Sequence, residues 1–369
     1  MPFTDPSPAG DFFISFLGIL FEGAPYIFLG ALIAGFIDAY LPSKTLEKIL
    51  PKNAGLAVVA SAFLGLPFPV CECAIVPVIR RLVQKGLPVA CGVAYMLASP
   101  IVNPITAFST WNAFYRPTED VQTLAWTMTG YRLGLGLLCA IGVGLVVLKL
   151  KPASVLLAKL ISYRKEDDGD SKHDHSDHGD DHHHDHGDDH HHDHGEEHAH
   201  DHHDHDHDHD HDHDHDHHHH DEEQPDRLVR AFRSTQRDFM DTALFFTIGI
   251  AVTAFFNTQI DKSWVSTIAS NEWLASPSMM LLAFVLSLCS TSDAFVASNL
   301  PLPLSSKLSF LVFGPMVDVK LVFMYATVFR PKFIAFLCIG LFIVVGIASV
   351  LLLGEDYLNG FGLLPEGGP

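Results

Sequence analysis

The sequence predicts an all-α integral membrane protein with about eight transmembrane segments in two repeats, two of these segments being broken or re-entrant. Three observations predict this fold. Long apolar runs cover most of the chain, landmark residues recur in the same order in both halves, and one hydrophilic insert separates the halves. We therefore expect a first membrane repeat at 1–165, a disordered His/Asp-rich cytoplasmic loop at 166–223, and a second membrane repeat at 224–369.

The composition changes at the same boundaries. The 369-residue chain has a formal net charge of -20, yet all of its 25 His and 25 of its 43 acidic residues lie in the insert at 166–223. The rest of the chain carries 22 basic and 18 acidic residues and is about 57% apolar. An acidic soluble protein is therefore excluded, and the apolar body is typical of a protein that lies in a bilayer.

Six apolar stretches are long enough to cross about 30 Å of hydrocarbon as single helices. They run at about 12–39, 87–112, 122–150, 239–256, 308–329 and 331–353. Two further stretches, 53–86 and 276–307, would each be about 50 Å long as a helix, too long for one straight span. Polar residues interrupt them, at Pro67–Cys73 and at Leu288–Asp293, so we expect broken helices or re-entrant hairpins.

Several landmarks support an internal duplication. The matching pairs, in order, are Phe21–Gly30 with Met240–Gly249, Cys71 with Cys289, and Ser99–Asn103 with Gly314–Asp318. The first pair aligns without gaps and places Glu22 over Asp241 and Gly30 over Gly249. Although the match is weak residue by residue, it predicts that each half contains equivalent spans and one broken segment.

The distribution of basic residues favours two hairpins over eight simple crossings. With hairpins, every Lys/Arg cluster lies on the cytoplasmic side together with the His-rich loop. Both termini, which carry no base before Lys44 or after Lys332, then lie outside, and the two halves are inverted. Simple crossings would instead put Lys44–Lys52 and Arg80–Lys85 on opposite sides of the membrane. Both alternatives place the loop in the cytoplasm.

The sharpest local motif is Pro-Val-Cys-Glu-Cys, which ends at Cys73. Two thiols with a carboxylate between them form a compact soft-donor cluster, suited to Cu(I), Zn(II) or trivalent arsenic. We predict Cys71, Glu72 and Cys73 as metal ligands, together with Cys289 and Asp293 from the second half. The structural alternatives are cysteines that pack beside a helix break and a carboxylate that caps the next helix.

Other polar or helix-breaking residues fall inside apolar stretches. An intramembrane carboxylate is costly, and a proline frees a backbone carbonyl, so both often mark a transport pathway. We predict that this pathway includes Glu22, Pro100, Asn103, Asp241, Pro315 and Asp318. The alternatives are interfacial carboxylates and ordinary kinked helices. Arg132 and Lys320 offer charge compensation nearby in the sequence.

The insert has a single apolar residue, Ala199, so it has nothing to bury against the entropy cost of folding. Imidazoles alternate with carboxylates along its last part and present loose sites for Zn, Ni or Cu. The clearest candidates for metal ligands are His205, His207, His209, His211 and His213. The alternative is a solvating spacer, although a spacer needs polarity rather than 25 His.

Three blocks together resemble a known family: Pro-Val-Cys-Glu-Cys, Leu97–Pro104 and Ser292–Ala297. They look like the predicted-permease family that contains the organoarsenical efflux permeases, and like its branch of copper/zinc efflux transporters with a central His-rich loop. The resemblance covers essentially the whole chain except the loop. It implies that Cys71, Cys73 and Cys289 carry substrate, with export across the cytoplasmic membrane of a bacterium.

These observations predict a permease that exports Zn(II) or Cu(I) from the cytoplasm, with the bilayer and metal ions as its partners. Because the chain has no G-x-x-x-x-G-K-[ST] motif, an ion or proton gradient is the expected driving force. The alternatives are a trivalent organoarsenical efflux permease and a membrane-anchored metal buffer or sensor. Since no His lies outside the insert, an enzyme is not expected. We expect no prosthetic group and no nucleic acid, and a homo-oligomer is compatible with the sequence.

Overall fold

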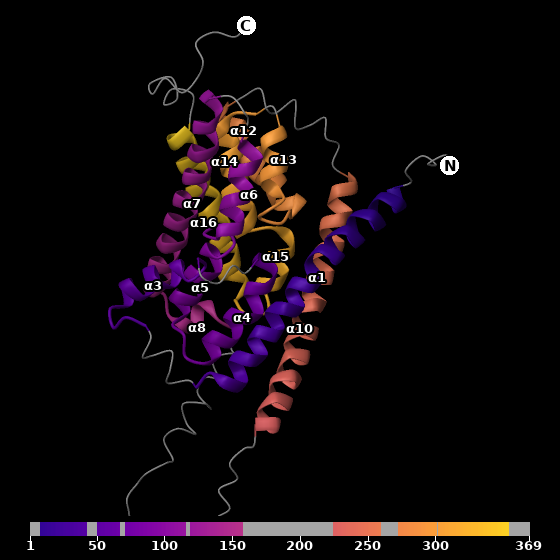
Figure 1. Ribbon diagram of the computed structural model, residues 1–369, viewed down its shortest axis with the longest axis vertical. Coiled ribbons are helices and arrows are strands. Elements are labelled where there is room, and N and C mark those ends of the chain that lie inside the picture. The colour runs from indigo at the N-terminus through magenta and orange to yellow at the C-terminus, as the bar shows by residue number, and fades with distance from the viewer. Residues whose placement is uncertain are drawn as a thin grey trace, which may run out of the picture.

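A computed structural model describes residues 8–42, 50–66, 71–115, 119–157, 224–259, 272–300 and 302–353. Within these ranges the regular structure is α-helical, apart from one isolated antiparallel bridge between Leu156 and Phe329 (Figure 1). The insert at 166–223, with the candidate ligands from His205 to His213, lies outside the described residues.

The described part of the first half contains seven helices, the last of them a single short turn. Its helices are α1 (Pro8–Tyr40), α3 (Ala54–Phe63), α4 (Glu72–Gln84), α5 (Val89–Ala98), α6 (Pro104–Phe114), α7 (Glu119–Leu148) and α8 (Pro152–Val155). The second half follows a similar order. Its helices are α10 (Gln224–Gln259), α12 (Glu272–Leu286), α13 (Asp293–Asn299), α14 (Leu304–Met316), α15 (Val319–Tyr325) and α16 (Pro331–Leu353).

The helical content and the apolar spans confirm an α-helical membrane protein. Five stretches of the described chain are long and apolar enough to cross a membrane: Ala9–Tyr40, Thr123–Leu148, Arg227–Thr258, Leu304–Tyr325 and Pro331–Leu353. Three shorter apolar helices accompany them, Ala54–Phe63, Val89–Ala98 and Leu274–Leu286. The eight segments and the two repeats stay predictions.

Two predicted spans are not continuous helices. The stretch at 87–112 divides into α5 and α6, and 308–329 divides into α14 and α15. The residues before the second helix, Asn103 and Asp318, both have an extended backbone (φ -139°) and cap that helix with their side chains. Because α5 has only 10 residues, it rises about 15 Å, half the thickness of the hydrocarbon.

The span predicted at 239–256 begins too late, because α10 already starts at Gln224. Hydropathy detects only the apolar part of this helix, whereas its polar first turns are stabilised by packing beside α1. There, Ser234 Oγ donates a hydrogen bond of 2.8 Å to Asp38 Oδ2. Asp238, one turn further, pairs with Arg81 of α4 through a hydrogen bond of 2.9 Å between Arg81 Nη2 and Asp238 Oδ1.

The segment predicted to be broken at 53–86 folds back on itself. Gly65, just after α3, lies against the backbone of Ser99 at the break between α5 and α6. At the other end of α4, Lys85 Nζ lies 3.7 Å from Asp38 Oδ1, close to the end of α1. Gly55, at the start of α3, lies beside Leu145 near the end of α7. The end of α3 therefore lies beside the break between α5 and α6, and the start of α3 and the end of α4 both lie at the end of the bundle where α1 and α7 finish.

The segment at 276–307 folds back from the opposite end. Ser276 Oγ lies 3.3 Å from Ser306 Oγ, so α12 and α14 start side by side. Lys307 Nζ donates to the carbonyl of Ser298 near the end of α13 at 3.3 Å. Figure 1 shows that α1 begins and α16 ends toward this end of the molecule, whereas α8 and the start of α10, which flank the insert, lie toward the other. The two segments therefore fold back from opposite ends of the described bundle.

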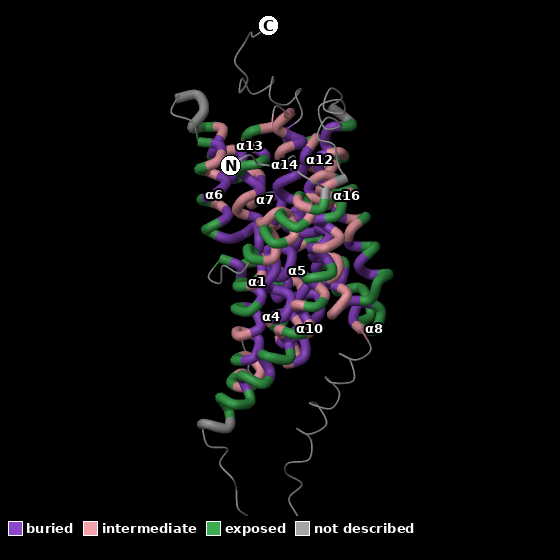
Figure 2. Tube along the Cα trace, turned by 90° about the vertical axis from the view of Figure 1, so that its right-hand side faces the viewer, coloured by how far each residue is buried: buried purple, intermediate pink, exposed green. Residues whose placement is uncertain are grey.

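Small residues bring the two breaks toward α1 and α10, which lie side by side in antiparallel orientation (Figure 1). A Cβ at Gly30 of α1 would collide with the backbone of Ala74 in α4. Similarly, a Cβ at Gly249 of α10 would lie 2.9 Å from the Cα of Lys320 in α15. Figure 2 shows buried residues through the centre of the bundle and exposed ones on the outward faces. The close approaches therefore place α4 and α15 in the interior.

Candidate transport site

The first break places two thiols and a carboxylate at the start of α4. Cys71 is the N-cap residue (φ -71°, ψ 165°), and its carbonyl accepts hydrogen bonds from the N–H groups of Ala74 and Ile75. Glu72 and Cys73 occupy the first turn and are 1% and 5% exposed. A carboxylate here also interacts favourably with the positive end of the helix dipole. The start of α4 thus directs the Cys-Glu-Cys motif into the bundle.

The second break begins directly after α12. Ser287 has a φ of 49°, in the left-handed region that residues other than glycine rarely adopt. Its N–H still donates to the carbonyl of Ala283 at 3.2 Å, which closes the last turn of the helix. The carbonyl of Cys289 then accepts hydrogen bonds of 3.0 Å from the N–H groups of Ser292 and Asp293. This turn starts α13 and leaves Cys289 at the tip of the break.

The two breaks meet at a small cavity of about 10 Å³, which has room for about one water molecule. Three thiols line it, those of Cys71, Cys73 and Cys289, together with the carboxylates of Glu22 and Glu72. The other lining residues are Ile19, Gly23, Tyr26, Phe246 and Lys320. The structure therefore brings together the three predicted substrate cysteines from both halves of the chain.

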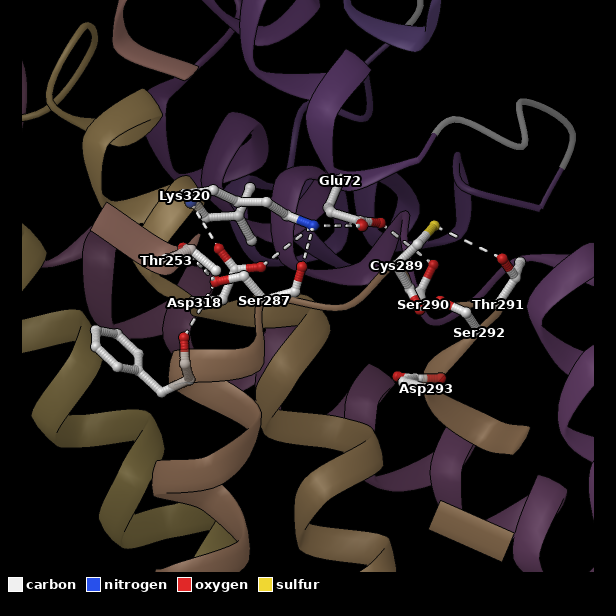
Figure 3. Close-up of polar contacts among 12 residues, drawn as sticks. Glu72, Thr253, Ser287, Cys289, Ser290, Thr291, Ser292, Asp293, Asp318 and Lys320 are labelled. Carbon is white, nitrogen blue, oxygen red and sulfur yellow. Dashed lines mark hydrogen bonds and ion pairs between the residues drawn. The ribbon is translucent and has the colours of Figure 1, made fainter. Parts of the chain in front are cut away.

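Lys320 of α15 contacts both breaks from within the bundle (Figure 3). Its side-chain nitrogen donates to the carbonyl of Ser287 at 2.8 Å and lies 3.4 Å from Glu72 Oε1. The same nitrogen lies 3.5 Å from Asp318 Oδ2. Ser290 Oγ also donates to Glu72 Oε2, at 3.3 Å. The buried ammonium group of Lys320 thus contacts the carbonyl of the strained residue Ser287 and two carboxylates.

Arg132 of α7 holds the second break from the other side, and its side chain is completely buried. Its Nη2 donates to both carboxylate oxygens of Asp293, at 3.0 and 2.8 Å, and to the carbonyl of Ser290 at 2.9 Å. Its Nη1 donates to Thr110 Oγ1 of α6 at 2.7 Å. These short contacts fix the start of α13 against α6 and α7.

Each break is therefore neutralised by a cation from the opposite half of the chain. Glu72 of the first half faces Lys320 of the second, and Asp293 of the second half faces Arg132 of the first. Removing one partner from a buried ion pair costs about 3–5 kcal/mol, because the other charge is left without compensation. These reciprocal contacts couple the two halves at the site.

Asn103 and Asp318 occupy similar places but have different surroundings. Asn103 Oδ1 accepts from the N–H of Ile105 at 2.8 Å, and Asp318 Oδ1 accepts from that of Leu321 at 2.7 Å. Both side chains therefore act as helix caps. Asp318 in addition faces Lys320 and belongs to the central charge cluster. Asn103 does not line the cavity.

The remaining predicted pathway residues also differ in whether they line the cavity. Pro100 is buried beside the break after α5, and Pro315 is buried in the last turn of α14. Glu22 lines the central cavity from α1. Asp241, which the sequence aligns with Glu22, instead pairs with Arg80 at 3.1 Å, and its side chain is 47% exposed. The structure thus brings Glu22 to the cysteines and leaves Asp241 outside the cavity.

Within the described residues, no three His, Cys, Asp or Glu side chains are grouped closely enough to hold a metal ion. The thiols and carboxylates around the cavity do not form a closed tetrahedral set of the kind found in structural zinc sites. The histidine candidates lie in the insert, outside the described residues.

The sequence showed the charges of this site but not their partners. Arg132 and Lys320 were identified only as nearby cations, and the pairs they form join residues far apart in the chain. The roles of Ser287 and Ser290 were missed. Their signal was a Ser/Thr-rich interruption of an apolar run, which indicates a break without showing which carbonyl or hydroxyl makes the contact.

Broken helices that meet at a buried polar site, inside a bundle of membrane-spanning helices, define a polytopic membrane permease. Residues 9–353 match a family model described as "Predicted permease". The chain belongs to this permease family, which confirms that part of the resemblance seen in the sequence.

Two bacterial relatives cover nearly the whole chain. The first is "UPF0718 protein YcgR" of Bacillus subtilis, 33% identical over 339 residues, which are 91% of this chain and 95% of that protein. The second is "Putative two-component membrane permease complex subunit" of Streptococcus mutans, 28% identical over 321 residues, which are 86% of this chain and 87% of that protein. No solved structure matches the chain.

Proposed function

We propose that this permease exports Zn(II) or Cu(I) from the cytoplasm across the bacterial inner membrane. The observation that carries the proposal is the cavity at which both breaks meet, where Cys71, Cys73 and Cys289 lie beside Glu22 and Glu72. Thiolates select soft and borderline cations, and carboxylates add negative charge for an ion that must leave again. A gradient drives the export, since the sequence has no nucleotide-binding motif.

The insert supports a metal substrate. It holds 25 His, whose imidazoles suit zinc and copper. The helix before it, α8, and the start of the helix after it, α10, lie at the end of the bundle opposite the start of α1 (Figure 1). In the proposed orientation this end faces the cytoplasm, so the insert captures ions on the side from which they are exported.

The second candidate is efflux of a trivalent organoarsenical, and one observation favours it. Lys320 neutralises part of the charge of Glu72, so the thiols face a carboxylate that is already paired. A neutral arsenical that binds two or three thiols needs no free negative charge. The third candidate, from another class, is a membrane-anchored metal buffer or sensor without transport, which would use the insert alone.

Metal accumulation in cells separates these candidates. In a strain that lacks the gene, cells carrying the wild-type chain should retain less zinc or copper than cells carrying the double variant Cys71→Ser, Cys73→Ser. The matched control is Cys338→Ser, the same change at a half-buried cysteine that does not line the cavity. This control should export as the wild type does.

The result would contradict the proposal if the double variant retained no more metal than the wild type at equal protein level. Resistance of the wild-type strain to methylarsenite alone would favour the second candidate. Removal of the insert alone, with both cysteines intact, would abolish the effect only if the chain were a buffer. Copurification of another protein would test whether the chain, like the streptococcal relative by its name, is a subunit of a complex.

A further inference from the structure

The centre of the described bundle holds an unequal number of buried charges. Three carboxylates and two cations lie there, each at most 3% exposed: Glu72, Asp293, Asp318, Arg132 and Lys320. The other buried charged residues of the described chain, Arg81 and Asp238, pair with each other near the insert end. With every group ionised, the central cluster would carry one surplus negative charge.

The surplus does not belong to Asp293. Both of its oxygens accept short hydrogen bonds from Arg132 Nη2, at 2.8 and 3.0 Å, which is the distance of a strong charge-assisted contact. This pair is balanced by itself. The imbalance therefore lies in the group formed by Glu72, Asp318 and Lys320.

Lys320 does not fully satisfy either of its carboxylates. Its short hydrogen bond, at 2.8 Å, goes to the carbonyl of Ser287, whereas Glu72 and Asp318 lie at 3.4 and 3.5 Å. Asp318 Oδ2 is completely buried and has no hydrogen-bond donor. Such an oxygen is costly as part of a carboxylate, because its charge is offset only by an ammonium group at 3.5 Å that is shared with Glu72. Asp318 Oδ2 is thus a buried oxygen at which the uptake of a positive charge is favourable.

We infer that Asp318 is the site of the proton that is exchanged for the exported cation, an inference that rests on the proposed function. A proton taken up from the outside onto Oδ2 removes the surplus charge, and Lys320 then pairs with Glu72 alone. When the proton leaves to the cytoplasm, the surplus returns and a metal cation in the adjoining cavity balances it. Proton and metal thus compete for the same surplus negative charge, which is the condition for antiport.

The surroundings of Asp318 support a titrating group at this position. Lys320 pairs with it from its own helix, and Glu72 and Cys73 of α4 interact with it electrostatically. Tyr325, further along α15, completes the groups on that side. From α10, Gly249 lies against Lys320, and the hydroxyl of Thr253 donates a hydrogen bond to Ser287 Oγ. Lys320 also lines the cavity of the three cysteines, so it connects the proton site to the substrate site.

Transport by the full-length protein in liposomes tests the inference, with radioactive zinc as the probe. Two activities are compared: accumulation driven by an imposed pH gradient, and exchange of zinc for zinc at equal pH. The exchange needs no net proton movement. We expect Asp318→Asn to retain exchange and to lose gradient-driven accumulation by about tenfold or more, the usual size of coupling between linked sites. Asp318→Glu should restore part of the accumulation.

The matched control is Asp11→Asn, the same change in the exposed first turn of α1, which should leave both activities unchanged. The inference is wrong if Asp318→Asn still accumulates zinc with proton movement, or if a sodium gradient drives the wild type at constant pH. Loss of both activities in a variant that elutes as the wild type does would also overturn it. If the wild type shows neither exchange nor accumulation of zinc, the proposed export of zinc itself fails.

Discussion

The two breaks are built from similar residues, but their carboxylates are paired with cations to different extents. In each, a helix starts with a carboxylate close behind a cysteine, and a cation from the other half of the chain faces that carboxylate. Among the carboxylates of the described chain, Arg132 pairs with Asp293 alone, with contacts of 2.8 and 3.0 Å. Glu72 shares Lys320 with Asp318 and a carbonyl, with its own contact at 3.4 Å.

This difference predicts that one break is rigid and that the other can adjust. The second break is held by a planar guanidinium that also reaches Thr110 and the carbonyl of Ser290, so its contacts define one geometry. The first break faces a single flexible ammonium group that has several acceptors within reach. We expect the start of α4 to adjust when substrate binds and the start of α13 to stay in place.

The largest effect should follow from removing Arg132, the cation that pairs with the second break. Arg132→Met leaves Asp293 buried without compensation and should destabilise the protein by about 3–5 kcal/mol. The midpoint of thermal unfolding in detergent, followed by the monodisperse fraction, measures the loss. The double variant Arg132→Met, Asp293→Leu should regain most of it, because removal of both charges is often neutral. A double variant as unstable as the single one would show that the pair is not the cause.

A smaller loss of stability should follow from removing Lys320, the cation that pairs with the first break. Lys320→Met removes longer contacts than Arg132→Met does, so we expect a destabilisation of about 3 kcal/mol, the lower end of the range for breaking a buried ion pair. The same unfolding midpoint serves as the measure, with Glu72→Gln added to remove one of the two uncompensated carboxylates. If Lys320→Met proved more damaging than Arg132→Met, the first break would be the more rigid one and the comparison would be reversed.

The smallest effect concerns the strained residue at the second break. Ser287→Gly relieves the φ of 49° but loses the hydroxyl contact with Thr253, so stability should change by about 1 kcal/mol or less. Ser292→Gly, at a residue with an ordinary φ of -82°, gains no such relief and should be destabilising. Equal losses at both positions would mean that the backbone of Ser287 is not strained.

The sequence predicted the breaks because they interrupt apolar runs. Cys71, Glu72 and Cys73 lie at a helix start, and the interruption predicted at Leu288–Asp293 falls between α12 and α13. It also predicted the three cysteines that line the cavity. It overestimated the continuity of 87–112, because apolar composition does not show where Asn103 leaves the helical conformation.

The partners of the buried charges could not be predicted in this way. Arg132 lies far from Asp293 in the sequence, and Lys320 is further still from Glu72. Nothing in the local pattern indicates which carboxylate each cation meets. The alignment of Glu22 with Asp241 gave both the same expectation, yet only Glu22 lines the cavity, because Asp241 pairs with Arg80 on α4.

By itself, the sequence determined that this is a helical membrane permease, where its helices break, and which thiols and carboxylates stand at those breaks. Local hydropathy and helix-breaking residues carry that information, since each acts over a few neighbouring positions. Only the tertiary structure decided that the breaks meet at one cavity, that each is neutralised across the two halves, and that Asp318 has an oxygen without a donor. Those features depend on contacts between distant segments, which the packing of α1 and α10 against α4 and α15 creates.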